Sequence, residues 1–289
     1  MSTTVSRPRR RLRDRDNSVG PVRVLIGTVI AALFSVPLYL VIVNVFKPST
    51  EIFAHPASLP ETPTLANFGA VLTRSDNLFW NGLINSTQIT VISVLVTILL
   101  GSMTAHYLAR NTGKVTQIVI VLIVVGMMIP GAVIIQPIIQ ILLGVGLIGT
   151  IPGLILVNIA SSLPFAIMVF LGFVRSIPIE LEQAAAVDGA GPFRIFWQIV
   201  FPLMRPAAAT VLIFVAVAVW NDFIMPLIIL GPGNGTTITV GVYRSVSKYV
   251  SDFGAVFAFM LLATIPILIL FLFFQRYFVK GLMSGATKG

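Results

Sequence analysis

Residues that could do chemistry are few in this chain and lie far apart. The 289 residues include two histidines and no cysteine, so a disulfide or a cysteine-based zinc site is excluded. His55 and His106 do not have the spacing of a metal-binding pair. The only Gly-Lys pair, Gly113-Lys114, lacks the rest of the loop G-x-x-x-x-G-K-[ST] that cradles nucleotide phosphates. The sequence therefore predicts a protein that is not an enzyme and has no metal or cofactor of its own.

Asp222 is the main ionisable residue inside an apolar run. It follows Trp220 and Asn221 in the stretch VAVAVWNDFIMPLIIL. A carboxylate at membrane depth often marks a transport pathway or a gating site. It can equally be a polar group that is hydrogen-bonded between helices and fixes their packing. We take these three residues as a candidate intramembrane polar cluster and leave both interpretations open.

The composition explains why such residues are rare. Hydrophobic residues make up 56% of the chain and charged residues 10%, whereas a soluble domain carries about 25% charged residues. The apolar runs are long and unbroken, which favours spanning helices over the alternating strands of a membrane barrel. We expect an all-α integral membrane protein with six transmembrane helices, at 24–46, 85–108, 115–143, 153–174, 206–230 and 255–278. The third run holds Pro130 and Pro137, so it should be kinked or split.

The positive charges predict how these helices are oriented. With the N-terminus inside, fifteen of the nineteen Lys and Arg residues lie in inside segments and four in outside segments. Such a bias places both termini in the cytoplasm. It also explains the net charge of +9 without a nucleic-acid partner. The expected order is a disordered basic tail (1–20), a first transmembrane helix (21–46), an ordered extracytoplasmic loop (47–84), a core (81–278) and a cytoplasmic tail (279–289).

The inside segment 175–206 carries charge between two apolar runs, and it divides into two predicted helices. Ser176, Pro178 and Glu180 are signals of a helix start. Three alanines follow, which form helix well and allow another surface to come close. The first helix should end at Gly189, and Pro192 should open the second.

The second helix of this segment is predicted to be amphipathic. One apolar face follows helical spacing and contains Phe193, Phe196, Trp197, Val200 and Leu203. Two interpretations remain open for the pair of helices. They could pass a push from a cytoplasmic partner into the membrane helices, or they could only anchor the loop at the membrane surface.

The stretch EQAAAVDGAGPFRIFWQIVFPLMRP resembles the EAA loop of the inner-membrane permeases of ATP-binding-cassette (ABC) importers. Further segments resemble the carbohydrate branch of that family, in particular its smaller maltose-type permease. They are PTLANF, WNGLINSTQITV, TAHYLAR, MIPGAVIIQPIIQILLGVGLIGTIPGLIL, LPFAIMVFLGFVRSIPIELEQ, WNDFIMPL and FFQRYFVKGLMSGATKG. The resemblance covers nearly the whole chain after the N-terminal tail.

The resemblance implies a six-helix type I importer permease in the bacterial inner membrane. Its partners would be a second, different permease, two ATP-binding subunits that carry ATP and Mg, and an extracytoplasmic solute-binding protein that delivers a sugar. The residues that match the docking motif are Glu182, Gln183, Ala184, Ala185, Asp188, Gly189 and Ala190. The sequence departs from the motif at one position, because Gln183 stands where the leading glutamate is usual.

A second functional class is an ion-coupled or channel-like transporter of small polar solutes that works without ATPase partners. Such transporters usually carry more ionisable residues in their spans, or internal repeats. The scarcity of such residues here favours the importer permease.

Overall fold

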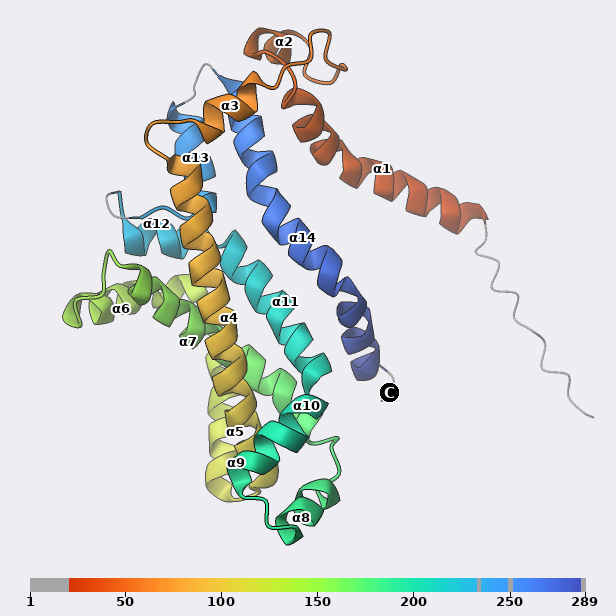
Figure 1. The fold of residues 1–289 in the computed structure, drawn as a ribbon, viewed down its shortest axis with the longest axis vertical. Helices are drawn as coiled ribbons and strands as arrows, with labels where there is room; N and C mark the ends of the chain where they lie inside the picture. The colour runs from red at the N-terminus through yellow and green to blue at the C-terminus, as the bar shows by residue number, and fades with distance from the viewer. Residues whose placement is uncertain (1–20, 233–234, 249–251, 287–289) are drawn as a thin grey trace, which may run out of the picture.

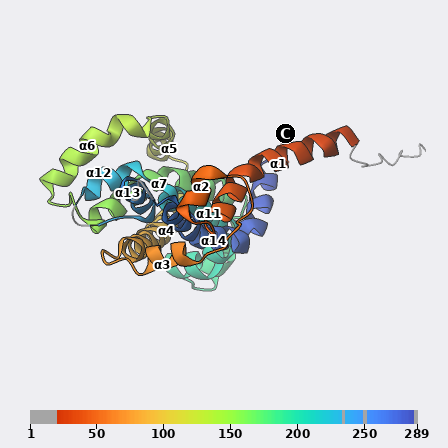
Figure 2. The same ribbon diagram turned by 90° about the horizontal axis from the view of Figure 1, so that it is seen from above.

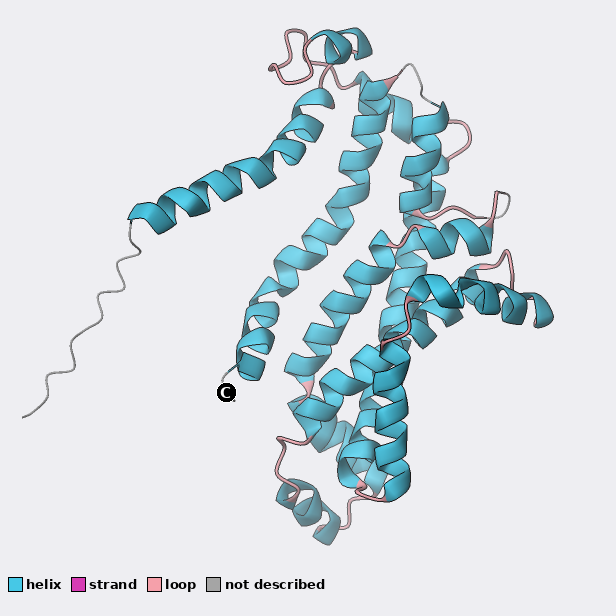
Figure 3. Cartoon of the chain, turned by 180° about the vertical axis from the view of Figure 1, so that it is seen from behind, coloured by secondary structure: helices cyan, strands magenta, loops and turns pink. Residues whose placement is uncertain are grey.

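The computed structural model describes residues 21–232, 235–248 and 252–286, and the predicted tail 1–20 lies outside this range. Throughout these residues the regular secondary structure is helical (Figures 1 and 3). Four helices are long and apolar enough to cross a membrane: α1 (Pro21–Asn44), α4 (Leu78–Arg110), α7 (Ile151–Val174) and α14 (Phe253–Ala286). Two further pairs of helical segments are bent at short breaks. They are Lys114–Met127 with Gly131–Gly144, and Pro192–Leu203 with Arg205–Asn221, so up to six spans result if each bent pair is one span.

The third predicted span is split, as expected from its prolines. It forms α5 (Lys114–Met127) and α6 (Gly131–Gly144), whose axes differ by 105°. The break comes directly before and at Pro130, which has no N–H to donate and which disfavours helical backbone at the residue before it. Pro137 lies within α6 and does not interrupt it.

The predicted fifth span, 206–230, is wrong as a continuous helix. α11 (Arg205–Asn221) ends before Asp222, and α12 (Ile224–Leu230) starts anew. Pro226 supplies the physical reason, since in an unbroken helix its ring would clash with the carbonyl of Asp222, four residues earlier. The Asp222 backbone is instead extended, and its side chain accepts a hydrogen bond from the N–H of Met225.

Two other helices extend past the predicted spans. α4 begins at Leu78 rather than at residue 85, and α14 continues to Ala286, through most of the segment predicted as a tail from 279. Hydropathy reports where a chain enters or leaves the apolar layer. Backbone hydrogen bonding does not stop there, so a helix can continue into the polar region.

The predicted outer loop is ordered and contains α2 (Ser49–Ala54) and α3 (Ala66–Leu72). The side chain of Lys47 is fully buried, and its ammonium group donates to the carbonyl of His55 at 2.8 Å and to the hydroxyl of Ser58 at 3.2 Å. The amide of Asn67 donates to the backbone carbonyls of Val45 and Lys47, just after α1. Buried polar groups with these partners hold the loop in one conformation.

α4 is the central helix of the bundle (Figure 1) and packs along α7 and α11. Gly101 permits the close approach to α7, because a Cβ there would lie 3.0 Å from the Cβ of Ala166. Near the other end of α4, the hydroxyl of Ser86 accepts the N–H of Ile238 at 2.8 Å. This contact holds the first turn of α13 (Ile238–Lys248) against α4.

α1 leaves the bundle on the side opposite α5 and α6 (Figure 2). From Val22 to Tyr39 every side chain is exposed. A helix this apolar needs lipid or another protein chain around it.

We expect Gly101→Leu to destabilise the bundle, because the added side chain has no room between α4 and α7. Overpacking of this kind costs about 1–3 kcal/mol. Gly172→Leu is the matched control, since Gly172 lies within α7 with no atom near its would-be Cβ. Thermal unfolding of the purified chain in detergent checks this. Equal midpoints for both variants would contradict the proposed contact.

Candidate functional site

The candidate docking helix forms where the sequence predicts it. α8 (Glu180–Val187) ends in a turn in which Gly189 has a φ of +82°. The N–H of Gly189 donates to the carbonyl of Ala186, and the N–H of Ala190 donates to the carbonyl of Ala185. This is a Schellman motif, which needs a left-handed residue and therefore favours glycine. The segment D-G-A thus fixes the sharp bend after α8.

The second helix of the loop differs from the prediction. It consists of α9 (Pro192–Ile195), a π-helical turn (Phe196–Val200) and α10 (Phe201–Leu203). Within the predicted face, Phe193 and Leu203 are exposed. The wider π turn shifts the register, so that the buried side chains are Ile195, Phe196, Val200 and Met204. A prediction made with the α-helical period alone could not include this shift.

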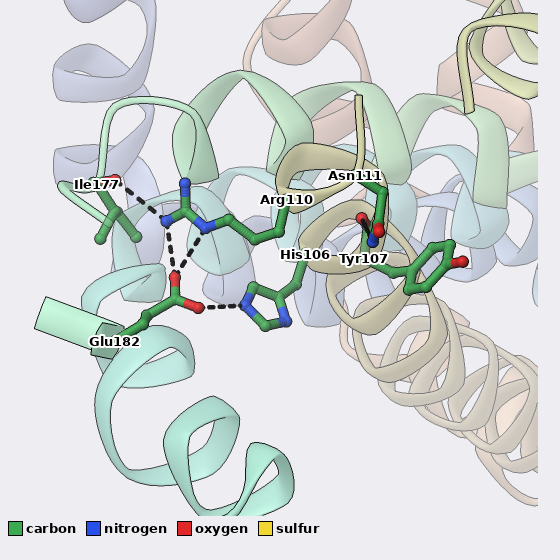
Figure 4. Close-up of polar contacts among 6 residues, drawn as sticks. All are labelled: His106, Tyr107, Arg110, Asn111, Ile177 and Glu182. Atoms are coloured by element: carbon green, nitrogen blue, oxygen red, sulfur yellow. Dashed lines mark hydrogen bonds and ion pairs between the residues drawn. The ribbon is translucent and has the colours of Figure 1, made fainter. Parts of the chain in front are cut away.

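Glu182 points back into the bundle and meets the end of α4 (Figure 4). One carboxylate oxygen lies 2.8 Å from Nε and 2.7 Å from Nη2 of Arg110. The other lies 2.9 Å from Nε2 of His106. The three side chains are only 13–20% exposed, so water screens their interaction weakly. Charge-assisted hydrogen bonds of this length are among the stronger polar contacts in proteins.

The same two residues of α4 hold the loop at two more points. Arg110 donates to the carbonyl of Ile177, in the turn before α8, at 3.1 Å. The ring of His106 packs against Phe196 of the π turn, with centroids 5.5 Å apart. The end of α4 therefore contacts the segments before, within and after α8. We call the side-chain set Glu182, His106 and Arg110 the α4–α8 clamp.

The other docking-motif residues divide into two groups. Ala185 and Ala190 are partly buried and pack against the core. The remaining residues face outward, and these are Gln183, Ala184, Asp188 and Gly189. They share the tip of the molecule with exposed apolar side chains, namely Ile179, Leu181, Val187 and Phe193. Val187 is 88% exposed. The tip thus presents small and apolar groups around a helix with no buried residue of its own.

The candidate polar cluster in the membrane does not converge on one point. Trp220 is buried, and its indole N–H donates to the carbonyl of Ala263 in α14 at 3.2 Å. Asn221 is exposed and donates to the carbonyl of Val217 in its own helix. Asp222 caps the first turn of α12. Each side chain therefore has a separate structural role at the break between α11 and α12.

Sequence reasoning missed the roles of His106 and Arg110. A signal was present, because the two lie four residues apart in TAHYLAR and therefore on one face of α4. Glu182 is the acidic residue of the loop that this face meets. The sequence alone does not show that this end of α4 lies next to the loop.

Comparison with known proteins agrees with this architecture. Residues 97–284 match the family described as the binding-protein-dependent transport system inner membrane component. The chain belongs to this family. It is therefore a multi-pass permease subunit of an ABC importer in the bacterial cell membrane and not an enzyme, and the ion-coupled or channel-like alternative is not supported.

One relative is the melibiose/raffinose/stachyose import permease protein MelC of Bacillus subtilis (strain 168). It is 33% identical over 266 residues, which cover 92% of this chain and 95% of MelC. Two crystal structures share the fold. A bacterial ABC transporter that imports the polysaccharide alginate matches with a TM-score of 0.80 and 20% identity over 89% of this chain and 95% of that chain. A bacterial alginate ABC transporter in complex with an alginate pentasaccharide-bound periplasmic protein matches with a TM-score of 0.66 and 17% identity. This match covers 88% of this chain and 92% of that chain.

We expect Glu182→Ala to release α8 from α4, because the substitution removes every side-chain contact of the α4–α8 clamp. Losing these bonds and leaving Arg110 without its carboxylate should cost about 2 kcal/mol, or about a thirtyfold rise in local opening. Hydrogen exchange of residues 180–190 measures this. Gln183→Ala is the control, since its side chain is exposed. Unchanged exchange in Glu182→Ala would contradict the clamp.

Proposed function

We propose that this chain forms half of the translocation pathway of an ABC sugar importer and couples to ATPase subunits through α8. The observation that carries the proposal is the tip of the molecule. There α8, a helix with no buried residue, presents small and apolar groups outward, while its residue Glu182 is bonded to Arg110 of the central helix α4. Such a helix is open to a partner on one side and fixed to the bundle on the other.

A sugar is the proposed substrate class because of the relatives. MelC is an import permease for melibiose, raffinose and stachyose, and it aligns with this chain along almost its full length. The alginate importer, which shares the fold, also handles a carbohydrate.

The coupling route follows the contacts of the loop. An ATPase that displaces α8 also pulls on Arg110 and His106, and therefore on the end of α4. α4 packs along α7 and α11, so a rotation of its end changes the packing of all three helices. Packed helices shift between discrete arrangements rather than bending continuously. The movement at the tip would thus reach the membrane helices as a rigid-body change.

The remaining partners complete the importer. Two ATP-binding subunits, one of them on this chain, would bind ATP and Mg and hydrolyse the nucleotide. A second, different permease would form the other half of the pathway, and an extracytoplasmic binding protein would deliver the sugar. In this arrangement the α8 end faces the cytoplasm and the α2–α3 cap faces outward, as the distribution of positive charges indicates.

We expect Val187→Asp to weaken docking of the ATPase, because a desolvated carboxylate at an apolar contact is costly. Val187 is a better probe than Ala185, whose side chain already packs on the core. Gly189 is a poorer probe too, because any other residue there would strain the left-handed turn. Co-purification of the ATPase subunit with the tagged, membrane-inserted permease is the measurement, and a loss of tenfold or more is expected.

Thr112→Asp is the control for this experiment. Thr112 is an exposed loop residue at the same end of the bundle, outside the tip defined above. The substitution adds the same negative charge at a position outside the proposed docking surface. Co-purification at the parental level with Val187→Asp, or an equal loss with Thr112→Asp, would count against docking at α8.

A further inference from the structure

The break between α11 and α12 exposes polar and aromatic groups that the docking role does not use. The side chain of Asn221 is exposed, and its amide nitrogen is bonded to the carbonyl of Val217 at 3.0 Å. Its carbonyl oxygen can accept a further hydrogen bond. Asp222 is partly exposed, and one of its carboxylate oxygens caps α12. The helix break therefore presents acceptor groups on two successive residues.

An aromatic pair begins at the residue that follows Asp222 in the chain. Phe223 and Tyr243 contact each other with centroids 5.3 Å apart and planes tilted by 59°. Tyr243 belongs to α13 and is 56% exposed. The hydroxyl of Thr239 in α13 donates to the backbone carbonyl of Asp222 at 2.7 Å. This bond holds α13 against the break, so the rings and the acceptors keep a fixed relation.

The exposed stripe of α11 differs from surfaces suited to lipid. It consists of Phe214, Ala218 and Asn221, which recur at helical spacing. Between residues 91 and 99 of α4, by contrast, the exposed side chains are all large and aliphatic, namely Val91, Ile92, Leu95 and Leu99. Ionisable groups at membrane depth almost always face protein or a water-filled cavity. The end of the stripe at Asn221 and Asp222 is therefore unsuited to acyl chains.

The depth of the break fits a solute that enters from the side opposite α8. Asn221 is the last residue of α11, which starts at Arg205 near the α8 end. Sixteen residues further along an α-helix correspond to about 24 Å, against an apolar layer of about 30 Å. The break thus lies in the half of the bilayer away from the proposed ATPase dock.

We propose that this surface, formed by Asn221, Asp222, Phe223 and Tyr243, contacts the sugar as it enters the pathway. Aromatic rings pack against the apolar C–H face of a sugar ring, and amide and carboxylate oxygens accept hydrogen bonds from its hydroxyls. A ligand site of this kind combines apolar surface with a few placed polar groups. The inference rests on the proposed function, and it assigns part of the sugar contact to this chain.

The absence of cysteine from the chain allows a direct test. Asn221→Cys and Tyr243→Cys are made separately, and Leu95→Cys on the aliphatic surface of α4 is the control. Each variant is assembled with the second permease, the ATPases and the binding protein in lipid nanodiscs without ATP. A negatively charged methanethiosulfonate reagent then reports which thiols meet water, because a thiolate does not form in lipid. Mass spectrometry measures how much reagent is attached to the permease chain.

We expect labelling at Asn221→Cys and Tyr243→Cys and none at Leu95→Cys. Melibiose, raffinose and stachyose serve as probes, and the sugar that the cysteine-free parent imports should slow labelling several-fold. Labelling in the isolated chain but not in the complex would overturn the inference, because the surface would then be covered by the second permease. Labelling of Asn221→Cys and Tyr243→Cys no faster than that of Leu95→Cys would overturn the inference as well.

The outcome also separates this inference from the proposed function. A parent complex that imports one sugar while both variants are labelled without protection overturns the inference alone. A parent that imports none of the three overturns the proposed substrate class, and the inference with it. In a second arm, Tyr243→Ala should lower sugar uptake about fivefold, since an aromatic contact is worth about 1 kcal/mol. Tyr243→Phe, which keeps the ring, should retain most of the uptake.

Discussion

The interaction between Glu182 and the end of α4 is the constraint on which the docking end depends. α8 has only eight residues and none of them is buried, and an isolated helix of that length is not stable in water. Several contacts fix its position, and two of them act directly on the docking motif. The Schellman turn at Gly189 closes its C-terminal end, and the carboxylate of Glu182 bonds Arg110 and His106. Without the bonds of Glu182, the tip would be held only by the packing of Ala185 and Ala190 and by the contacts at Ile177 and Phe196.

This arrangement divides two demands between neighbouring residues. A docking surface has to remain free for the partner, whereas a coupling element has to be held by the bundle. Glu182 meets the second demand from the inner side of α8, and Gln183, Ala184 and Val187 remain on the outer side. Gln183, at the leading position of the motif that this segment resembles, is not needed for the bond to α4, because Glu182 makes it.

Much of the loop could be predicted because its signals are local. Gly189 and Pro192 end and start helices through backbone rules that act within one turn. The split of the third span followed in the same way from its prolines. The π turn at 196–200 could not be predicted, since it depends on tertiary packing such as the contact of Phe196 with His106. The end of α11 was missed because the apolar run continues through 222–230, although Pro226 carried the signal. The partners of Glu182 lie more than 70 residues away in sequence, and only the folded chain brings them together.

The most direct test of the coupling route measures distances within the assembled importer. Spin labels at Tyr107→Cys and Glu180→Cys, both exposed positions on α4 and α8, report the distance between these helices by double electron–electron resonance. We expect this distance to stay the same with and without ATP in the otherwise cysteine-free chain, while labels on α8 and on the ATPase subunit move. In the Glu182→Ala background the distribution of this distance should broaden, or its mean should change with ATP. A nucleotide-dependent change in the chain that retains Glu182 would show that α8 moves independently of α4, and would contradict coupling through the clamp.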